Sequence, residues 1–152
     1  MNNDTSPQHT DGLQLRLIAL GNVDPYRFED PLQGWSLTDV RALALDPEVT
    51  VRRVAALSNW NLDIRLQEVL ASDPDETVVM NLLSRVDPSI ASTRLILDGP
   101  HPEARRALAR RNLVSEILFG LIHDTDQEVQ WSARKTLVRR CLLAPESNAA
   151  ST

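Results

Sequence analysis

The chain has 152 residues, 42% of them hydrophobic, and a net charge of −5 at pH 7, which fits one globular domain and argues against a generic nucleic-acid-binding surface. Its single cysteine, Cys141, excludes an internal disulfide framework and a metal site built from cysteines alone. Aromatic residues make up only 4%, so the core must consist mainly of Leu, Val, Ile and Ala, which favours helices over a strand-rich sandwich. We expect an all-α protein in a reducing, cytoplasmic compartment.

The first part of the chain is predicted to precede a set of repeats. Residues 1–12 are polar, lack the basic-then-apolar order of a signal peptide, and are expected to form a disordered tail. Residues 13–34 are expected to form a capping helix, ended by Gly21 in a left-handed conformation, and then an irregular connection. The apolar run 13–20 is interrupted by Gln14 and Arg16 and is too short to span a bilayer, so no membrane contact is expected.

Residues 35–142 contain about four copies of one unit with a period of 25–27 residues. One copy begins with DPEVTVRRVAAL at residue 46, and the others begin at residues 73, 99 and 124. Each start leads into an amphipathic helix, a polar turn and a second apolar stretch. The remaining residues, 143–152, are expected to form a second disordered tail. The period is measured between equivalent apolar positions, which are Val51, Val78, Ala104 and Val129.

An Asp-Pro pair opens two of these copies, at residues 46 and 73. Proline suits the first position of a helix, because its φ is fixed near the helical value and its missing N–H would have no partner there. It also moves the preceding residue out of the helical region, which ends the previous helix. Aspartate can cap free N–H groups, and either Asp73 or Asp75 could cap the following helix. We interpret the pair as a boundary between helices.

Apolar residues within each helix recur at helical spacing, as in Val78, Leu82 and Val86, and no alternating strand pattern is sustained. Helix pairs this short cannot bury their own apolar faces, so neighbouring copies must stack on one another. The pattern therefore predicts an all-α solenoid of short helix pairs behind the N-terminal capping helix.

The repeated segments resemble the variant leucine-rich repeats, a family related in shape to HEAT-type repeats. The resemblance is carried by VRRVAALSNWNLDIRLQEVLASDP, from residue 51, and by Ala44 and Ala71 in Leu-Ala pairs. It covers about residues 35–140 and implies a right-handed solenoid in which α-helices alternate with α- or 3₁₀-helices. The cysteines that hold an iron–sulfur cluster in some members are missing here, so no cofactor is implied. Four residues depart from the family pattern: Val79, Gly99, Thr125 and Gln130.

Pairs of adjacent basic residues recur along the repeats, and those of the C-terminal copies are the candidate partner-binding residues. Residues 1–100 have a net charge of −7, whereas residues 101–152 have a net charge of +2. Basic residues on successive turns of a solenoid could form a stripe for phosphate or an acidic partner. Adjacent helix residues point about 100° apart, so at most one of each pair joins a stripe. We expect Arg52 and Arg53 to be solvated surface and name these candidates: Arg105, Arg106, Arg110, Arg111, Arg134, Lys135, Arg139 and Arg140.

Two further groups of residues are candidates for a site. Trp60, Asp63 and Trp131 are residue types with which HEAT-like DNA glycosylases hold a damaged base, but packing at the edges of repeat joints explains both tryptophans more simply. The three histidines and Cys141 lack metal-ligand spacing. We expect His101 to be solvated or capping, and Cys141 to be a buried or half-buried structural thiol. No nucleophile motif and no Gly-rich phosphate loop is present.

These observations predict a non-enzymatic helical-repeat module that binds another protein along an exposed face and holds no cofactor. The alternative is a nucleic-acid-binding module that uses the Arg-rich C-terminal copies. Salt-dependent binding to duplex and single-stranded DNA separates the two.

Overall fold

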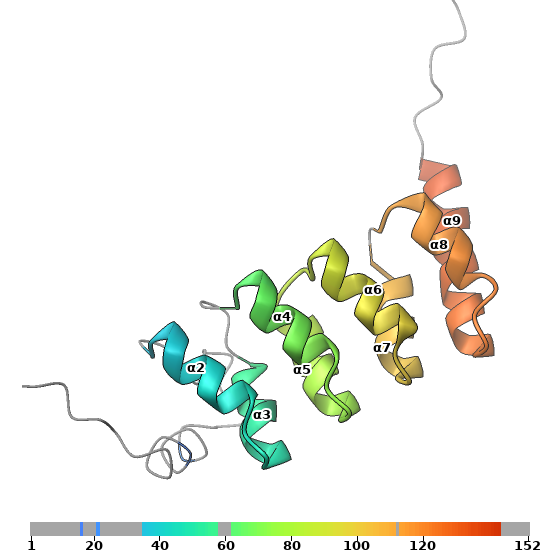
Figure 1. Cartoon of the computed structure of the whole chain (residues 1–152). Coiled ribbons are helices and arrows are strands. Elements are labelled where there is room, and N and C mark those ends of the chain that lie inside the picture. The colour runs from blue at the N-terminus through green and yellow to red at the C-terminus, as the bar shows by residue number, and fades with distance from the viewer. Residues whose placement is uncertain (1–15, 17–20, 22–34, 58–61, 112, 144–152) are drawn as a thin grey trace, which may run out of the picture. The chain divides into compact units, whose positions relative to one another are not determined.

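The structure is a computed structural model, and it describes residues 16, 21, 35–57, 62–111 and 113–143. All regular elements in this part of the chain are α-helices, which confirms the predicted all-α class. The chain divides into two compact units, Met1–Leu95 and Ile96–Thr152. The helices labelled in Figure 1 are α2 (Leu37–Ala44), α3 (Val49–Ala55), α4 (Ile64–Ala71), α5 (Glu76–Arg85), α6 (Ile90–Asp98), α7 (Pro102–Ala109), α8 (Ser115–Leu121) and α9 (Gln127–Leu143).

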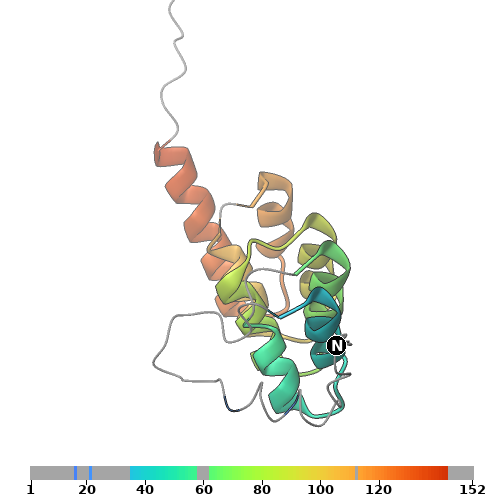
Figure 2. The same cartoon turned by 90° about the vertical axis from the view of Figure 1, so that its left-hand side faces the viewer.

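The first unit contains α2 to α5, and α6 begins in it. Helices α2 and α4 lie side by side in one layer, and α3 and α5 lie side by side in a second layer (Figures 1 and 2). The layers are joined because α2 packs on α3 and α4 packs on α5. The predicted inward positions Val51, Val78 and Leu82 are confirmed, since they are fully buried, whereas Val86 is half-buried at the C-cap of α5. The helical spacing in the sequence thus places the core of this unit.

The second unit is built around α9, against which both α7 and α8 pack. Its core combines Ala109 of α7, Leu118 and Leu121 of α8, and Val129 and Ala133 of α9. Helix α9 has 17 residues and ends at Leu143, one residue beyond the predicted end of the repeats. It presents one side to α7 and α8, and much of its other side is exposed.

The prolines of the two Asp-Pro pairs lie outside the helices, so their predicted place at the first helical position is wrong. Pro47 and Pro74 precede the N-cap residues Glu48 and Asp75. Pro102 takes the first helical position of α7 instead. The open choice of cap is resolved at α5, where the Asp75 carboxylate accepts the N–H of Val78 at 3.1 Å.

The aspartate that opens a copy forms a tight turn with its own backbone. Its carboxylate accepts the N–H two residues later, at 2.8 Å for Asp46, 2.9 Å for Asp73 and 2.8 Å for Asp124. Asp124 makes this bond although Thr125 replaces the proline. The aspartate, rather than the proline, therefore maintains the turn between copies.

Several predictions lie outside the described residues: the tail 1–12, most of the capping helix and its connection, Trp60, and residues 144–152. Arg16 is described, and its Nε lies 2.8 Å from Oδ2 of Asp46, the aspartate that opens a copy. Within the described ranges, no helix combines the length and apolar character needed to cross a membrane.

Candidate partner-binding surface

Arg52 joins two consecutive copies of the repeat in the first unit. Its Nε and Nη2 donate to the carboxylate of Asp73 at 2.7 and 3.2 Å. Its Nη1 donates to the carbonyl oxygens of Asp46 and Pro47, at 3.0 and 3.1 Å, in the loop of its own copy. One guanidinium thus satisfies the loop before its helix and the aspartate that opens the next copy.

Arg105 repeats this arrangement in the second unit. Its Nε and Nη2 donate to the Asp124 carboxylate at 2.8 and 3.2 Å, and its Nη1 donates to the Gly99 carbonyl at 2.8 Å. The two side chains are only 10% and 8% exposed. Burial raises the pKa of Asp124, but the hydrogen bonds from Arg105 and the Asp126 N–H outweigh it and lower that pKa. We call each of these two arginine–aspartate contacts, Arg52–Asp73 and Arg105–Asp124, a clamp.

Arg53 also bonds to the next copy. The prediction of solvated surface is wrong for Arg52, whose side chain is 16% exposed, and is limited by this ion pair for Arg53, whose side chain is 38% exposed. Its Nε and Nη2 lie 3.0 and 2.7 Å from the Asp75 carboxylate. The hydrogen bond from Arg53 is the main reason that the pKa of Asp75 falls to about 2, against the opposing effect of partial burial. Asp75 also caps α5, so Arg53 holds the cap of the next copy in place.

The sequence contains a signal for the clamp that pairwise comparison of the copies could have found. The copy that begins at residue 99 has Gly99 in the position of Asp73 and Asp124. The preceding copy has Val79 in the position of Arg52 and Arg105, and Val79 is fully buried. The aspartate and the arginine that would bond to it are therefore replaced together.

The remaining candidates on α7 and in the turn after it have varied surroundings. Arg106 pairs with Glu103 of the same helix, with 2.8 Å between Nη2 and Oε1. Arg110 is exposed, and Arg111 is half-buried. Arg105 is buried in the clamp, so Arg106, Arg110 and Arg111 are the candidates in and after α7 that a partner could reach.

Helix α9 carries the other four candidates on a single-sign surface. Residues 129–143 contain four cations and no carboxylate. Arg134, Lys135 and Arg139 are exposed, and Arg140 is half-buried. Among these are two large hydrophobic side chains, Trp131 and Val138, which are 56% and 59% exposed. The Lys135 Nζ lies 4.8 Å from the centroid of the Trp131 ring, within reach of a cation–π contact.

Five of these residues share one face of α9. They recur at i, i+3, i+4, i+7 and i+8, which is the spacing of a helix face. The buried residues Val129, Ser132, Ala133 and Thr136 lie on the opposite side of the helix. We call the exposed face the α9 surface, and it consists of Trp131, Arg134, Lys135, Val138 and Arg139.

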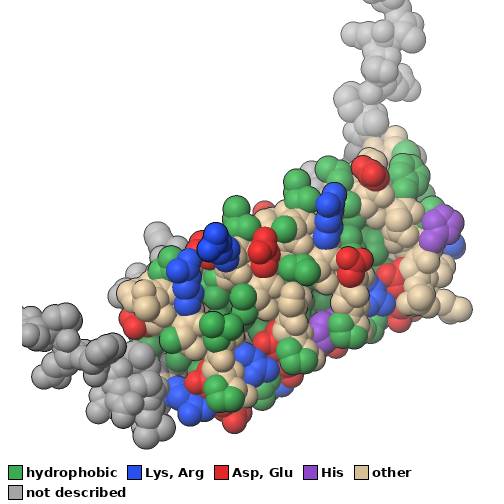
Figure 3. Space-filling view, in the orientation of Figure 1, with side chains coloured by type: hydrophobic (Ala, Val, Ile, Leu, Met, Phe, Trp, Pro, Cys, Tyr) green, Lys and Arg blue, Asp and Glu red, His purple; other side chains and the backbone are tan. Residues whose placement is uncertain are grey.

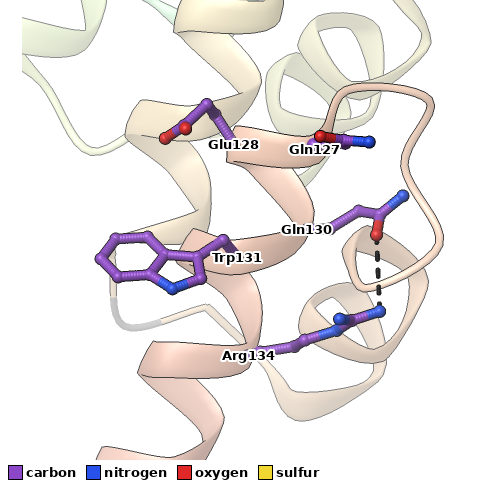
Figure 4. A pocket seen from close by; sticks show the side chains of 5 residues that line it. All are labelled: Gln127, Glu128, Gln130, Trp131 and Arg134. Atoms are coloured by element: carbon purple, nitrogen blue, oxygen red, sulfur yellow. Dashed lines mark hydrogen bonds between the residues drawn. The ribbon is translucent and has the colours of Figure 1, made fainter.

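An open hollow of about 520 Å³ lies at the N-terminal end of the α9 surface (Figure 4). It is lined by Gln127, Glu128, Gln130, Trp131 and Arg134. Figure 4 shows the indole standing out from the helix on one side and Arg134 extending toward Gln130, whose Oε1 accepts from Nη2 at 3.4 Å. The hollow thus offers a flat apolar ring, a guanidinium and amide groups at one place.

Gln130 and Trp131 occupy the positions that Arg52 and Arg53 hold in α3. The Gln130 Nε2 donates to the Asp124 carbonyl at 2.7 Å, just as Arg52 donates to the Asp46 carbonyl. The shorter Gln130 side chain has one NH₂ group, which donates to its own loop. It lacks the further N–H donors with which an arginine also binds an aspartate of another copy. The residues that join copies in α3 are therefore replaced in α9.

The outer surface of α2 and α4, in the first unit, differs in charge from the α9 surface. Figure 3 shows hydrophobic, basic and acidic side chains mixed over this face. Ile64 is 60% exposed, and Arg41 beside it forms an ion pair with Asp63. Arg41 on this face is thus paired with a carboxylate, unlike the cations of the α9 surface.

Three other predictions are corrected or limited by the structure. Cys141 is exposed, not buried or half-buried, and His101 is buried at the N-cap position of α7, not solvated. Trp131 does not pack at a joint, because it is exposed on α9. The Asp63 carboxylate is engaged, since it accepts the N–H of Leu66 at 2.8 Å and pairs with Arg41.

The sequence predicts only part of the α9 surface. It identifies the cations as candidates but not the exposure of Trp131 and Val138. The available signal was the spacing of these two residues with Lys135, opposite Val129 and Ala133 in the same helix.

No protein-family model, curated protein or solved structure matches the chain. The resemblance to the variant leucine-rich repeats therefore stays a prediction. The described part of the chain also contains no group of three or more His, Cys, Asp or Glu side chains placed to hold a metal ion.

Proposed function

We propose that the chain is a non-enzymatic helical-repeat module that binds another protein through the α9 surface. Its helix pairs are those of a right-handed solenoid of the variant leucine-rich repeat type. The two layers of helices in the first unit and the clamp between its copies support this architecture. Solenoids use extended helix faces for binding.

The observation that carries the proposal is the exposure of Trp131 and Val138 within a cluster of cations. Exposing large apolar side chains to water is unfavourable, so burying them against a partner lowers the free energy. Aromatic residues and Arg are also the types enriched in the centres of protein interfaces. The ring of Trp131 has a polar N–H at its edge, which suits it to an anchor that is dry on one side and hydrogen-bonded on the other.

Nucleic-acid binding is the second candidate function, and the four cations of residues 129–143 favour it. Phosphate contacts would make binding fall steeply with salt, whereas an interface anchored by Trp131 and Val138 would keep much of its strength. Comparing retention on DNA at low and moderate salt separates these two functions.

The test is affinity capture from the native host with the full chain and two variants. One variant carries Trp131→Ala and Val138→Ala, and the control carries Leu45→Ala, an apolar side chain that is 68% exposed in the first unit. We expect the same proteins to be retained by the wild type and the control and to be lost from the double variant. Equal retention by all three proteins contradicts the proposal, and retention of nucleic acid alone supports the second candidate.

A further inference from the structure

The three cations of the α9 surface are not paired with any carboxylate that the structure describes. Within the described residues, Arg134, Lys135 and Arg139 form no ion pair, and the one hydrogen bond among them joins Arg134 to Gln130. Among the described residues that precede these cations in the chain, the nearest acidic side chains are engaged elsewhere or lie at the start of the helix. Asp124 belongs to the clamp, and Asp126 accepts the N–H groups of Glu128 and Val129 at 2.9 and 3.0 Å.

Within the α9 surface, only the position of Trp131 has a counterpart in α3, and that counterpart bonds to an acidic loop. There Arg53, which corresponds to Trp131, bonds to the carboxylate of Asp75 in the acidic loop of the next copy. Arg52 beside it bonds to Asp73 of the same loop. The first helix of an inner copy thus receives a short acidic segment, DPDE from residue 73.

We propose that the α9 surface binds an acidic segment of a partner protein, in which carboxylates flank a large apolar side chain. Arg134, Lys135 and Arg139 pair with the carboxylates, and Trp131 and Val138 contact the apolar side chain. This inference rests on the proposed function and specifies the chemistry of the partner. Charge complementarity selects this occupant, because Arg134, Lys135 and Arg139, which form no ion pair within the described residues, lie on the same helix face as the two exposed hydrophobic residues.

The dimensions and surroundings of the surface favour a peptide over a nucleic acid. Residues 131–139 span about 12 Å of helix axis, at roughly 1.5 Å per residue, which matches a few residues of extended chain. Glu128 lines the hollow beside Trp131. Its carboxylate repels a continuous polyanion, whereas a short segment with local carboxylates avoids it.

The experiment measures binding of a fluorescein-labelled synthetic peptide, in which Asp-Glu pairs flank one Phe, to the full chain by fluorescence anisotropy. Two control peptides replace the acids by Asn and Gln, or the Phe by Ser. Variant proteins are Lys135→Gln with Arg139→Gln, and a matched control, Arg65→Gln with Arg94→Gln, which removes two exposed cations from α4 and α6. Circular dichroism checks that each variant keeps the helical content of the wild type.

We expect the acidic Phe peptide to bind the wild type and the matched control equally, and to bind the Lys135 and Arg139 variant about tenfold more weakly, a change of roughly 1.4 kcal/mol. Either control peptide should bind more weakly than the parent. Equal binding to both variants overturns the inference, as does tighter binding of single-stranded or duplex DNA than of the peptide at moderate salt. If host proteins require Trp131 and Val138 but the peptide does not bind, the proposed function stands and the acidic class of partner is wrong.

Discussion

Helices α3 and α9 use the same two positions of the repeat in different ways. In α3, Arg52 and Arg53 bond to Asp73 and Asp75 of the following copy. In α9, Gln130 bonds to its own loop and to Arg134 of the same helix, and Trp131 is exposed. A position that joins copies within the first unit is thus available for a partner in α9. The difference shows that the clamp is a property of a pair of copies and not of one helix.

A third case supports this view. Val79 and Gly99 stand where an arginine and its aspartate would form a clamp, and both are apolar. The chain divides into its two compact units in this same interval, between Leu95 and Ile96. The two clamps that the structure describes, Arg52–Asp73 and Arg105–Asp124, each lie within one unit.

The largest effect should come from breaking the core on which the first unit depends. Leu82 is fully buried in α5, so Leu82→Asp places an unpaired charge among apolar side chains and should cost at least about 4 kcal/mol, enough to unfold the unit. Thermal unfolding followed by circular dichroism measures this. Leu45→Asp is the matched control, since Leu45 is 68% exposed and the same change should leave the melting temperature nearly constant. Wild-type melting of Leu82→Asp would show that the repeat register is wrong.

Breaking the clamp itself should have the next largest effect. Arg105→Gln can keep the bond to the Gly99 carbonyl, as Gln130 does in its own copy, but leaves the buried Asp124 without its cation. We expect a loss of about 3 kcal/mol in the free energy of unfolding, measured by urea denaturation at neutral pH. The matched change Arg106→Gln removes a cation paired only with the half-exposed Glu103 and should cost under about 1 kcal/mol. Equal losses for the two variants would mean that the clamp contributes nothing beyond a surface ion pair.

A smaller effect with a definite pH dependence is expected at Asp75. Its pKa is about 2 in the folded chain, against about 3.9 in an unfolded one, so its ion pair with Arg53 stabilises the fold above about pH 4 and is lost as the pH falls toward 2. Asp75→Asn keeps a good N-cap but removes the charge, at a cost of about 1 kcal/mol near pH 7 after allowance for solvent screening. Urea denaturation of both proteins from pH 7 to pH 2 should show the difference shrinking below about pH 4. A difference that stays constant with pH would assign the effect to the cap alone.

The sequence predicted the helices and their buried faces well, because both follow from local periodicity. Val51, Val78 and Leu82 were placed correctly by spacing alone. The function of Arg52 and the location of Pro47 were predicted incorrectly, because they depend on contacts outside one helix. An arginine in a helix pattern looks solvated unless its aspartate, some twenty residues later, is known to lie beside it. The exposure of Trp131 was missed for the same reason, since it depends on which residues pack against α9 and which do not.

The smallest effect should come from restoring the arginine in α9. Gln130→Arg recreates the residue of α3 and α7, and the new guanidinium can still donate to the Asp124 carbonyl. Residues 144–152 contain no aspartate for its other nitrogens, so the free energy of unfolding should change by less than about 0.5 kcal/mol. Gln130→Arg is the reverse of Arg105→Gln at the equivalent position. Comparing the two changes in the free energy of unfolding therefore measures the arginine with and without an aspartate of another copy. A gain as large as the loss at Arg105 would show that the arginine stabilises its own copy alone, and the clamp would then not be the contact that joins one copy to the next.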